Sequence, residues 1–217
     1  MKIAIFGGSF NPIHFGHLRA AEELSQDFLD KIIFVPTNTT SNKKSPLHSP
    51  DERLKMISSV VKNHRGFEVS DIEIRRGGVS YSYETVLRFK DLYPNDDLYF
   101  IVGSDAYLKI KTWKHSSGIF NTVNFIVINR GCGSFNWKNM DEYINCLPDD
   151  IKSTIVKDPE RKRFVSSSGN FIIFFNITRM DISSTLIRDN FKKNVSNRFL
   201  LPKEIIDYII KNRIYVK

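Results

Sequence analysis

The chain begins with an apolar segment that runs directly into a glycine-rich loop and then into a helix, and this order restricts the fold more than any other feature. Residues 2–6 contain the run Ile3-Ala4-Ile5-Phe6 and predict a buried strand, which Gly7 and Gly8 end. Residues 12–27 contain a helix, because their apolar residues recur at helical spacing. A strand followed at once by a helix is the unit from which parallel sheets are built.

The remainder of the chain repeats this alternation. Further strands are predicted at 31–36, 67–74, 98–102, 123–128 and 171–175, and further helices at 49–63, 82–93, 183–190 and 202–213. The second helix has a clear start, because Ser49, Pro50 and Glu52 fit a capping box with proline in the first turn. Residues 37–49 are polar and predict an exposed loop. We therefore expect an α/β fold with a Rossmann-like, doubly wound, mostly parallel sheet and helices on both faces.

The length favours one domain. At 217 residues the chain suits a single domain spanning 1–217, with a helical part at about 183–217. Residues 131–169 do not follow the alternation, and we expect them to be an insertion of loops around one or two short helices. No apolar run approaches the roughly 20 residues of a membrane-spanning helix. The two cysteines exclude a disulfide scaffold, so a cytoplasmic protein is expected.

The net charge of +8 is distributed unevenly. Residues 152–217 hold 14 basic and 6 acidic side chains, which accounts for the whole excess. Such a surplus suits a nucleoside polyphosphate or nucleic acid, or is simply a solvated basic face. Because no helix-turn-helix, RNA-recognition signature or zinc finger is present, we expect neither a nucleic-acid partner nor a membrane partner. A homo-oligomer is compatible with the sequence.

The usual nucleotide-binding loops are missing. The first strand is not followed by G-x-G-x-x-G, and the second ends at Val35-Pro36 without the acidic residue that holds a ribose. A Walker loop is also absent from the sequence. A nucleotide would therefore have to bind to a different sequence motif.

A candidate nucleotide-binding motif is the run Gly7-Gly-Ser-Phe-Asn-Pro-Ile-His-Phe-Gly-His17. Glycine at 8 allows the backbone to approach a ligand closely, and Pro12 sets a turn. His14 and His17 fall where the helix begins, so their ring N–H groups would add to the free backbone amides that attract phosphate there. The pattern predicts a phosphate-binding site with His14 and His17 as candidate functional residues.

A second motif lies near the end of the chain, in Ile182-Ser-Ser-Thr-Leu-Ile-Arg188. Ser183 or Ser184 can cap a helix, and their hydroxyls and amides can meet phosphate oxygens. Arg188 follows Ser184 by four positions and Thr185 by three, which places all of them on one helix face. A guanidinium there suits a polyphosphate. We expect the two motifs to converge on one triphosphate site.

These two runs resemble the H-x-G-H and I-S-S-T-x-I-R signatures of a nucleotidyltransferase superfamily. Members of that superfamily transfer a nucleotidyl group from a triphosphate to an acceptor and release pyrophosphate. The resemblance implies that His17, His14 and Arg188 are the catalytic residues. It also implies ATP-binding roles for a further set: Gly8, Ser9, Phe10, Gly103, Asp105, Arg130, Ser183, Ser184 and Thr185.

Across nearly its whole length the sequence is similar to the bacterial nicotinate mononucleotide adenylyltransferases. The similarity rests on four stretches besides the two motifs: Ser49–Met56, Gly78–Thr85, Phe100–Asp105 with Trp113, and Leu201-Pro202. It implies ATP and nicotinate mononucleotide as small-molecule substrates, with Mg²⁺ as the cofactor bridging phosphate oxygens. It also implies that the acceptor is bound by Lys43 or Lys44, Ser82, Tyr83 and Trp113. No metal ligand is expected from the protein itself.

The sequence departs from the family at a few positions. Asn11 stands where the family more often has Asp, Ser82 where it has Thr, and Glu84 where it has Asp. Each change is small in shape, and we expect the turn at Asn11 to be kept.

Three other functions stay open on the sequence. Phosphopantetheine adenylyltransferases and cytidylyltransferases of small phosphorylated alcohols share the H-x-G-H loop, although Trp113 and residues 80–85 favour a pyridine nucleotide. A class I aminoacyl-tRNA synthetase fragment also uses such a loop, but no K-M-S-K-S-like segment is present. A non-catalytic nucleotide-binding protein would keep the fold without the reaction.

Overall fold

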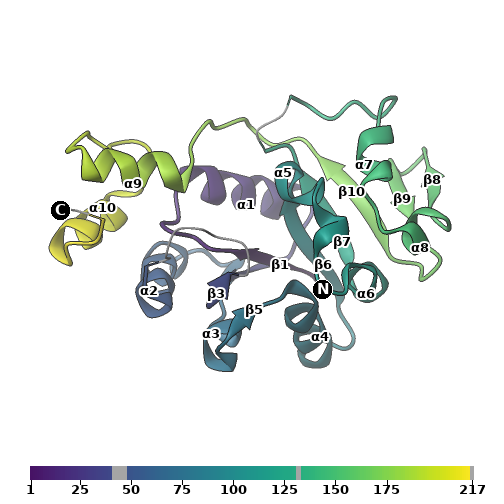
Figure 1. Ribbon diagram of the computed structural model, residues 1–217, viewed down its shortest axis with the longest axis horizontal. Helices are drawn as coiled ribbons and strands as arrows, with labels where there is room; N and C mark the ends of the chain where they lie inside the picture. Colours follow the sequence, from purple (N-terminus) through teal and green to yellow (C-terminus); the bar gives the residue numbers. More distant parts are fainter. Residues whose placement is uncertain (41–47, 131–132, 216–217) are drawn as a thin grey trace. The chain divides into compact units, whose positions relative to one another are not determined.

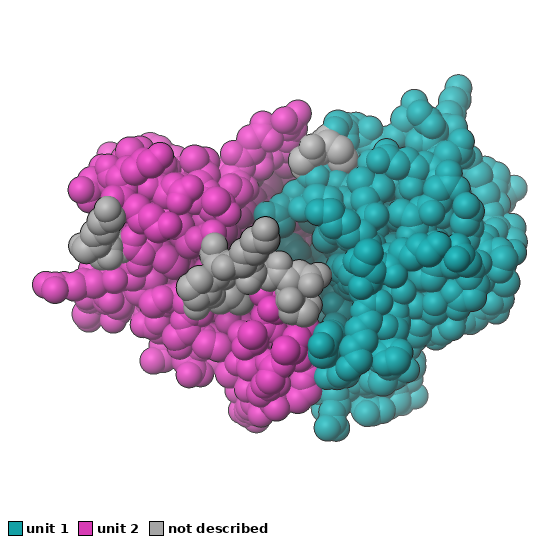
Figure 2. Space-filling model, in the orientation of Figure 1, with its two compact units in different colours: residues 1–7, 81–177 teal, residues 8–80, 178–217 magenta. Residues whose placement is uncertain are grey.

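The structure, a computed structural model, describes residues 1–40, 48–130 and 133–215. It contains two compact units: unit 1 comprises residues 1–7 and 81–177, and unit 2 comprises residues 8–80 and 178–217 (Figure 2). None of the described helices is long and apolar enough to cross a membrane.

Unit 1 is built on a sheet of six strands (Figure 1). In spatial order they are β1 (Lys2–Gly8), β6 (Asp97–Gly103), β7 (Asn124–Ile128), β10 (Phe171–Phe175), β9 (Arg163–Val165) and β8 (Val156–Asp158). The pairs β1–β6, β6–β7 and β7–β10 are parallel, whereas β9 and β8 are antiparallel additions. Every residue of β7 is buried, as expected for a parallel strand covered on both faces. The predicted Rossmann-like α/β fold is confirmed.

The helices of unit 1 are short and follow the strands. They are α4 (Ser82–Leu92), α5 (Ser104–Tyr107), α6 (Ser116–Thr122), α7 (Asp141–Asn145) and α8 (Asp149–Lys152), with a 3₁₀ turn at Ile110–Thr112. The helices α7 and α8 and the hairpin β8–β9 come from the segment predicted as an insertion. The two short helices are confirmed, but the expectation of loops elsewhere missed this hairpin, because its strands have only three residues each.

Unit 2 combines two small parallel strand pairs with longer helices. The strands are β2 (Lys31–Pro36) with β4 (Phe67–Val69), and β3 (Thr39–Thr40) with β5 (Val79–Ser80). The helices are α1 (Phe15–Asp27), α2 (Pro50–Val61), α3 (Ile72–Arg76), α9 (Ser184–Lys192) and α10 (Lys203–Lys211). The predicted helices at 12–27, 49–63, 183–190 and 202–213 are confirmed within a few residues.

Three sequence predictions in unit 2 need correction. The strand predicted over 67–74 ends at Val69. The backbone N–H of Arg75 donates to Asp71 O at 2.8 Å, which closes the first turn of α3, and the exposed Asp71–Arg75 ion pair adds modest support. The segment predicted as a loop over 37–49 contains the strand β3. The residue before this strand, Asn38, donates its backbone N–H to Ser80 Oγ at 2.8 Å. Among the described residues, Ser49 occupies the N-cap without a side-chain hydrogen bond, so the capping box is wrong.

A buried arginine organises the loops of unit 2. Arg53, on α2, is fully buried, and its guanidinium donates to four backbone carbonyls. These are His48 O at 2.9 Å, Ser9 O at 2.8 Å, Thr37 O at 2.5 Å and Asn38 O at 3.1 Å. Burial lowers the pKa of Arg53, but a guanidinium stays charged in proteins. Three separate loops therefore depend on one side chain.

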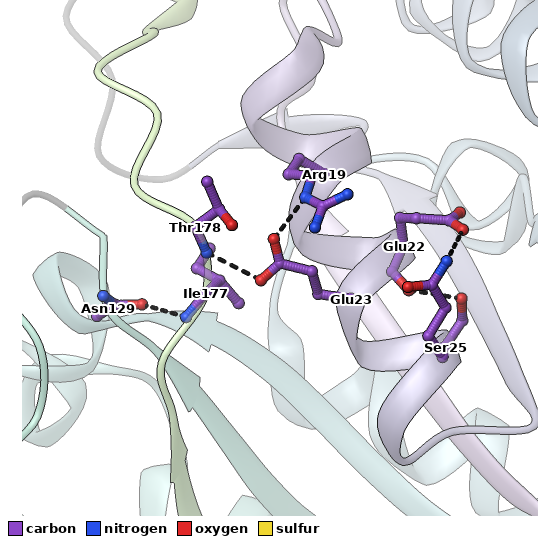
Figure 3. A network of polar contacts seen from close by, with 8 residues as sticks. Arg19, Glu22, Glu23, Ser25, Asn129, Ile177 and Thr178 are labelled. Atoms are coloured by element: carbon purple, nitrogen blue, oxygen red, sulfur yellow. Dashed lines mark hydrogen bonds and ion pairs between the residues drawn. The ribbon is translucent and has the colours of Figure 1, made fainter.

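At residues 177–178 the chain passes from unit 1 to unit 2, and each backbone amide is held within its own unit (Figure 3). Asn129 Oδ1 accepts from Ile177 at 2.7 Å. Glu23, on α1, accepts from Thr178 at 2.8 Å and from Arg19 Nε at 2.5 Å. Burial raises the pKa of Glu23, but the hydrogen bonds from Thr178 and Arg19 outweigh it and leave the pKa lowered.

We expect Glu23→Gln to lower stability at neutral pH and to matter less in acid. Because the native Glu23 pKa is lowered, its contribution is present above the unfolded value of about 4.3 and is lost as the pH falls through the native value. The melting temperatures of the two proteins should therefore differ at pH 7 and converge towards about pH 3. A gap that stays constant over this range would contradict the ion pair's role.

Arg53→Met should destabilise unit 2 strongly, since it leaves four backbone carbonyls without their donor. We expect a loss of about 3 kcal/mol or more in the free energy of unfolding, measured in urea. Lys55→Met, at an exposed position of the same helix, is the matched control and should change the free energy by less than about 0.5 kcal/mol. Equal effects of the two variants would show that Arg53 is dispensable.

Candidate functional site

Unit 2 brings the two predicted phosphate motifs together. Ser184 Oγ donates to the carbonyl of Pro12 at 2.9 Å, and Arg188 Nη1 donates to the carbonyl of Asn11 at 2.8 Å. A Cβ on Gly16 would lie 3.8 Å from the carbonyl oxygen of Ile182, just before α9. Residues more than 170 positions apart are thus in direct contact, as the sequence predicted.

The two histidines stand at the start of α1. His14 is the N-cap residue, and both side chains are buried, with exposed fractions of 1% for His14 and 9% for His17. Their rings lie 3.7 Å apart between centroids. Gly16 is needed here, because a Cβ would lie 3.0 Å from His14 Nδ1. The predicted pair of imidazoles at a helix N-terminus is therefore present.

One hydrogen bond sets the protonation of His17. The backbone N–H of His14 donates to His17 Nδ1 at 3.3 Å, so Nδ1 must carry a lone pair. We assign the ring proton of the neutral imidazole to Nε2 on this ground. His17 therefore offers one N–H donor from Nε2, oriented by the helix start itself.

The ring of Phe10 packs against the ring of His17. Its side chain is 1% exposed, and its ring packs 5.0 Å from the His17 ring and 5.7 Å from Phe34. The backbone of Phe10 has φ of 42°, and a Cβ on Gly8 would lie 3.1 Å from the Phe10 ring. The side chain of Phe10 is thus a core group, so Phe10 can offer a nucleotide only its backbone groups.

The start of α9 contains the second half of the site. Ser183 caps the helix, accepting the amide of Leu186 at 3.2 Å, which confirms the predicted cap. Arg188 Nη2 donates to Thr185 Oγ1 at 3.1 Å, and Nη1 binds Asn11 as described. The hydroxyl proton of Ser184 is directed to Pro12, so Ser184 can offer a phosphate its backbone amide rather than its hydroxyl. The guanidinium is held by two partners.

Unit 1 gathers three further predicted residues at the carboxyl ends of β6 and β7. A Cβ on Gly103 would lie 2.6 Å from Asp105 Oδ1 and 3.2 Å from Arg130 Cδ. Ser104, which sequence reasoning missed, joins the strand ends, because its hydroxyl donates to Arg130 O at 2.7 Å. Ligands of parallel α/β sheets bind at the carboxyl ends of the strands, so this place suits a nucleoside.

The predicted acceptor residues of unit 1 lie at the start of α4 and before α6. Ser82 is the first residue of α4, and the Tyr83 ring lies against Gly118, where a Cβ would come within 2.5 Å of it. Trp113 is half-buried and packs edge-on against Phe100, with centroids 6.1 Å apart. Lys43 and Lys44 lie outside the described residues.

Two residues of unit 2 were missed by sequence reasoning. Arg53 shares the buried face of α2 with Met56 and Ile57, and an arginine on such a face is the signal that could have drawn attention to it. Tyr215, whose hydroxyl donates to Asn11 Oδ1 at 2.5 Å, follows α10 in a short tail and has no local signal.

The described residues contain no group of three or more His, Cys, Asp or Glu side chains able to hold a metal ion. The chemical content of the site is therefore hydrogen-bond donors and positive charge: two helix N-termini, imidazole N–H groups and one oriented guanidinium. This set suits an anion that gains charge during a reaction.

Comparison with known proteins identifies the family of the chain. The family described as Cytidylyltransferase-like matches residues 5–190. A probable nicotinate-nucleotide adenylyltransferase of Citrifermentans bemidjiense is 40% identical over 220 residues, covering 100% of this chain and 99% of the relative. One from Geotalea uraniireducens is 37% identical, covering 99% and 98%.

Among solved structures, the Plasmodium falciparum nicotinic acid mononucleotide adenylyltransferase complexed with NaAD superposes with a TM-score of 0.74. It is 22% identical, and the match covers 99% of this chain and 97% of that one. This likeness supports the fold. The full-length relatives and the family match show that the chain belongs to the nicotinate-nucleotide adenylyltransferase family of nucleotidyltransferases.

Proposed function

We propose that the chain transfers the adenylyl group of ATP to the 5′-phosphate of nicotinate mononucleotide, giving nicotinate adenine dinucleotide and pyrophosphate. The observation that carries this proposal is the contact between the two motifs, Arg188 to Asn11 at 2.8 Å and Ser184 to Pro12 at 2.9 Å. The full-length relatives, whose printed names give this activity, support the choice of substrates.

The reaction is a displacement at the α-phosphorus of ATP. An oxygen of the acceptor phosphate attacks in line, and pyrophosphate leaves with its bonding electron pair. Because no covalent intermediate is needed, the protein acts by positioning two anions and stabilising the negative charge that develops.

His17 and Arg188 have different parts in this scheme. His17 donates Nε2–H to the α-phosphate, and His14 contacts the phosphates beside it. Arg188, with the amides of Ser183, Ser184 and Thr185 at the start of α9, binds the β- and γ-phosphates. The two partners that hold Arg188 reduce the entropy lost on binding, since the guanidinium is oriented beforehand.

Unit 1 supplies the groups for the nucleoside parts. Asp105 accepts from the hydroxyls of the ATP ribose, and Gly103 and Arg130 flank the adenosine. Trp113 offers a flat ring for stacking on the pyridine ring, while Ser82 and the first amides of α4 meet its carboxylate. Ser82 stands at the first position of this helix, where backbone amides and the positive end of the helix dipole attract an anion. Either Lys43 or Lys44 approaches the acceptor phosphate.

Mg²⁺ would accompany ATP, with the triphosphate rather than a set of protein carboxylates holding it. The donor set fits this, since the described residues contain no carboxylate cluster, and Mg²⁺ commonly keeps several waters. Its chemistry there is to neutralise phosphate charge.

We also propose that residues 1–217 act as one nucleotidyltransferase domain with an insertion at 131–169, in the cytoplasm. The absence of a described membrane-spanning helix is compatible with this setting. A homo-oligomer is compatible with the proposal and is not needed for the chemistry.

Pyrophosphate release from parallel reactions tests the function. ATP with nicotinate mononucleotide should react fastest, well ahead of nicotinamide mononucleotide and of phosphopantetheine. Faster reaction with phosphopantetheine, or of CTP with a small phosphorylated alcohol, would identify one of the alternative transferases. Binding of ATP without release in any mixture would indicate a non-catalytic nucleotide-binding protein.

Replacing His17 should remove a preoriented donor and leave the fold intact. We expect His17→Ala to lower kcat about 10²–10³-fold, the usual effect of losing one donor to a developing charge. His17→Gln, which keeps one N–H donor, should recover part of that loss. His64→Ala, in the same unit but outside the site, serves as the control. A loss below about fivefold for His17→Ala would exclude it from the reacting groups.

A further inference from the structure

The side chain of Asn11 hydrogen-bonds to two parts of unit 2 that have no role in the proposed reaction, the C-terminal tail and His48. Asn11 is 3% exposed, and its Oδ1 accepts from the Tyr215 hydroxyl at 2.5 Å and from the backbone N–H of His48 at 3.2 Å. Both lone pairs of this oxygen are therefore used. The C-terminal tail and His48 are thus tied to the first motif.

The main chain of the same residue holds the proposed phosphate-binding arginine. The carbonyl of Asn11 accepts from Arg188 Nη1 at 2.8 Å, while Thr185 Oγ1 accepts from Nη2 at 3.1 Å. A rotation of the Asn11 peptide would move one of the two points that orient the guanidinium. The hydroxyl of Tyr215 therefore acts on Arg188 through a single residue.

Tyr215 is itself fixed in an unusual backbone conformation. Its φ of 61° is left-handed, which is costly for a residue with a Cβ. The tail is anchored by Ile214, which is 1% exposed and donates its amide to Ile209 O at 2.9 Å. The Tyr215 ring packs 5.5 Å from His48 and 6.4 Å from Phe191. These contacts must compensate the backbone cost, so the hydroxyl is held at one place.

The raised pKa of the Tyr215 hydroxyl is consistent with its role as a hydrogen-bond donor at neutral pH. Burial raises the pKa of Tyr215, and the positive charges of Arg188 and Arg53 lower it only in part. The hydroxyl therefore remains protonated throughout the neutral range and donates its proton to Asn11.

We propose that Tyr215 is a positioning residue for adenylyl transfer, whose hydroxyl fixes Asn11 and thereby orients Arg188 towards the triphosphate. This inference rests on the proposed function, in which Arg188 binds the β- and γ-phosphates. The proposal predicts that loss of the Tyr215 hydroxyl changes the KM for ATP but not the KM for the acceptor, because Arg188 is assigned to ATP alone. A purely structural tyrosine would affect stability or both substrates alike.

Tyr215→Phe tests the proposal, since it keeps the ring and removes only the donor. We expect the KM for ATP to rise about 3- to 10-fold, the usual range for one lost hydrogen bond, with the KM for nicotinate mononucleotide within about twofold. Tyr208→Phe, on α10, is the matched control. In the described part of the chain its hydroxyl makes no hydrogen bond, so both KM values should stay unchanged. Equal rises for both substrates with Tyr215→Phe, or no rise, would overturn the proposal.

A double-mutant cycle tests whether the effect passes through Asn11. Asn11→Ala removes the acceptor of the same hydrogen bond. Adding Tyr215→Phe to it should therefore change the KM for ATP by less than about twofold. Additive effects of the two substitutions would show that Tyr215 acts by another route and would contradict the proposal.

Binding of a non-hydrolysable ATP analogue, measured by calorimetry, separates this inference from the proposed function. Weaker binding to Tyr215→Phe than to the unaltered protein, by about the same 3- to 10-fold, supports the positioning role whichever acceptor the enzyme uses. If the unaltered protein transfers to nicotinate mononucleotide but Tyr215→Phe binds the analogue equally well, only the positioning role fails. If no acceptor reacts, the proposed function fails on its own.

Discussion

Two carbonyl groups in the turn after the first strand bring the two predicted motifs of unit 2 together. The carbonyls of Asn11 and Pro12 accept from Arg188 and Ser184. A turn early in the chain and a helix near its end are held in contact by these bonds, together with the bond from Phe15 N to Leu200 O at 3.2 Å. The helix starts of α1 and α9, each with its free amides, are brought to one place as a result.

The electrostatic content of the site comes from a few oriented groups rather than from net charge. The basic surplus lies in residues 152–217, and Arg188 is the basic residue of that region whose hydrogen bond to the first motif is described above. Arg163, in the basic run at 161–163, pairs instead with Asp158 at 2.9 Å. Most of the surplus therefore behaves as a solvated face. The donors at the site are effective because they are fixed and partly buried, where charge interactions are less screened.

Local signals in the sequence predicted most of the fold. The apolar periodicity of the sequence predicted the buried strands and the longer helices. The composition of the two motifs was enough to place them at helix starts. Periodicity failed at residues 70–74, where a strand-like alternation forms the short helix α3, closed by the backbone bond from Arg75 N to Asp71 O. It also failed for the three-residue strands of the hairpin β8–β9, which are too short to show a pattern.

The supporting residues of the site could not be predicted in the same way. Arg53 and Tyr215 act through hydrogen bonds to residues that are distant in sequence. Arg53 lies in the family-like stretch Ser49–Met56, but that stretch does not reveal which carbonyls it binds, and Tyr215 lies in no recognisable motif. The sequence allowed Ser183 or Ser184 to cap a helix and allowed the hydroxyls and amides of both to meet phosphate oxygens. The structure instead uses one as a helix cap and the other as a link to Pro12, because buried carbonyls and helix amides need partners before any ligand arrives.

A crystal structure with a non-hydrolysable ATP analogue tests the central claim most directly. The account predicts that the α-phosphate lies within hydrogen-bond distance of His17 Nε2 and that the β- and γ-phosphates contact Arg188 and the first amides of α9. A triphosphate bound away from both motifs, or in contact with His17 while Arg188 remains turned from it, would contradict the claim that the two motifs form one site.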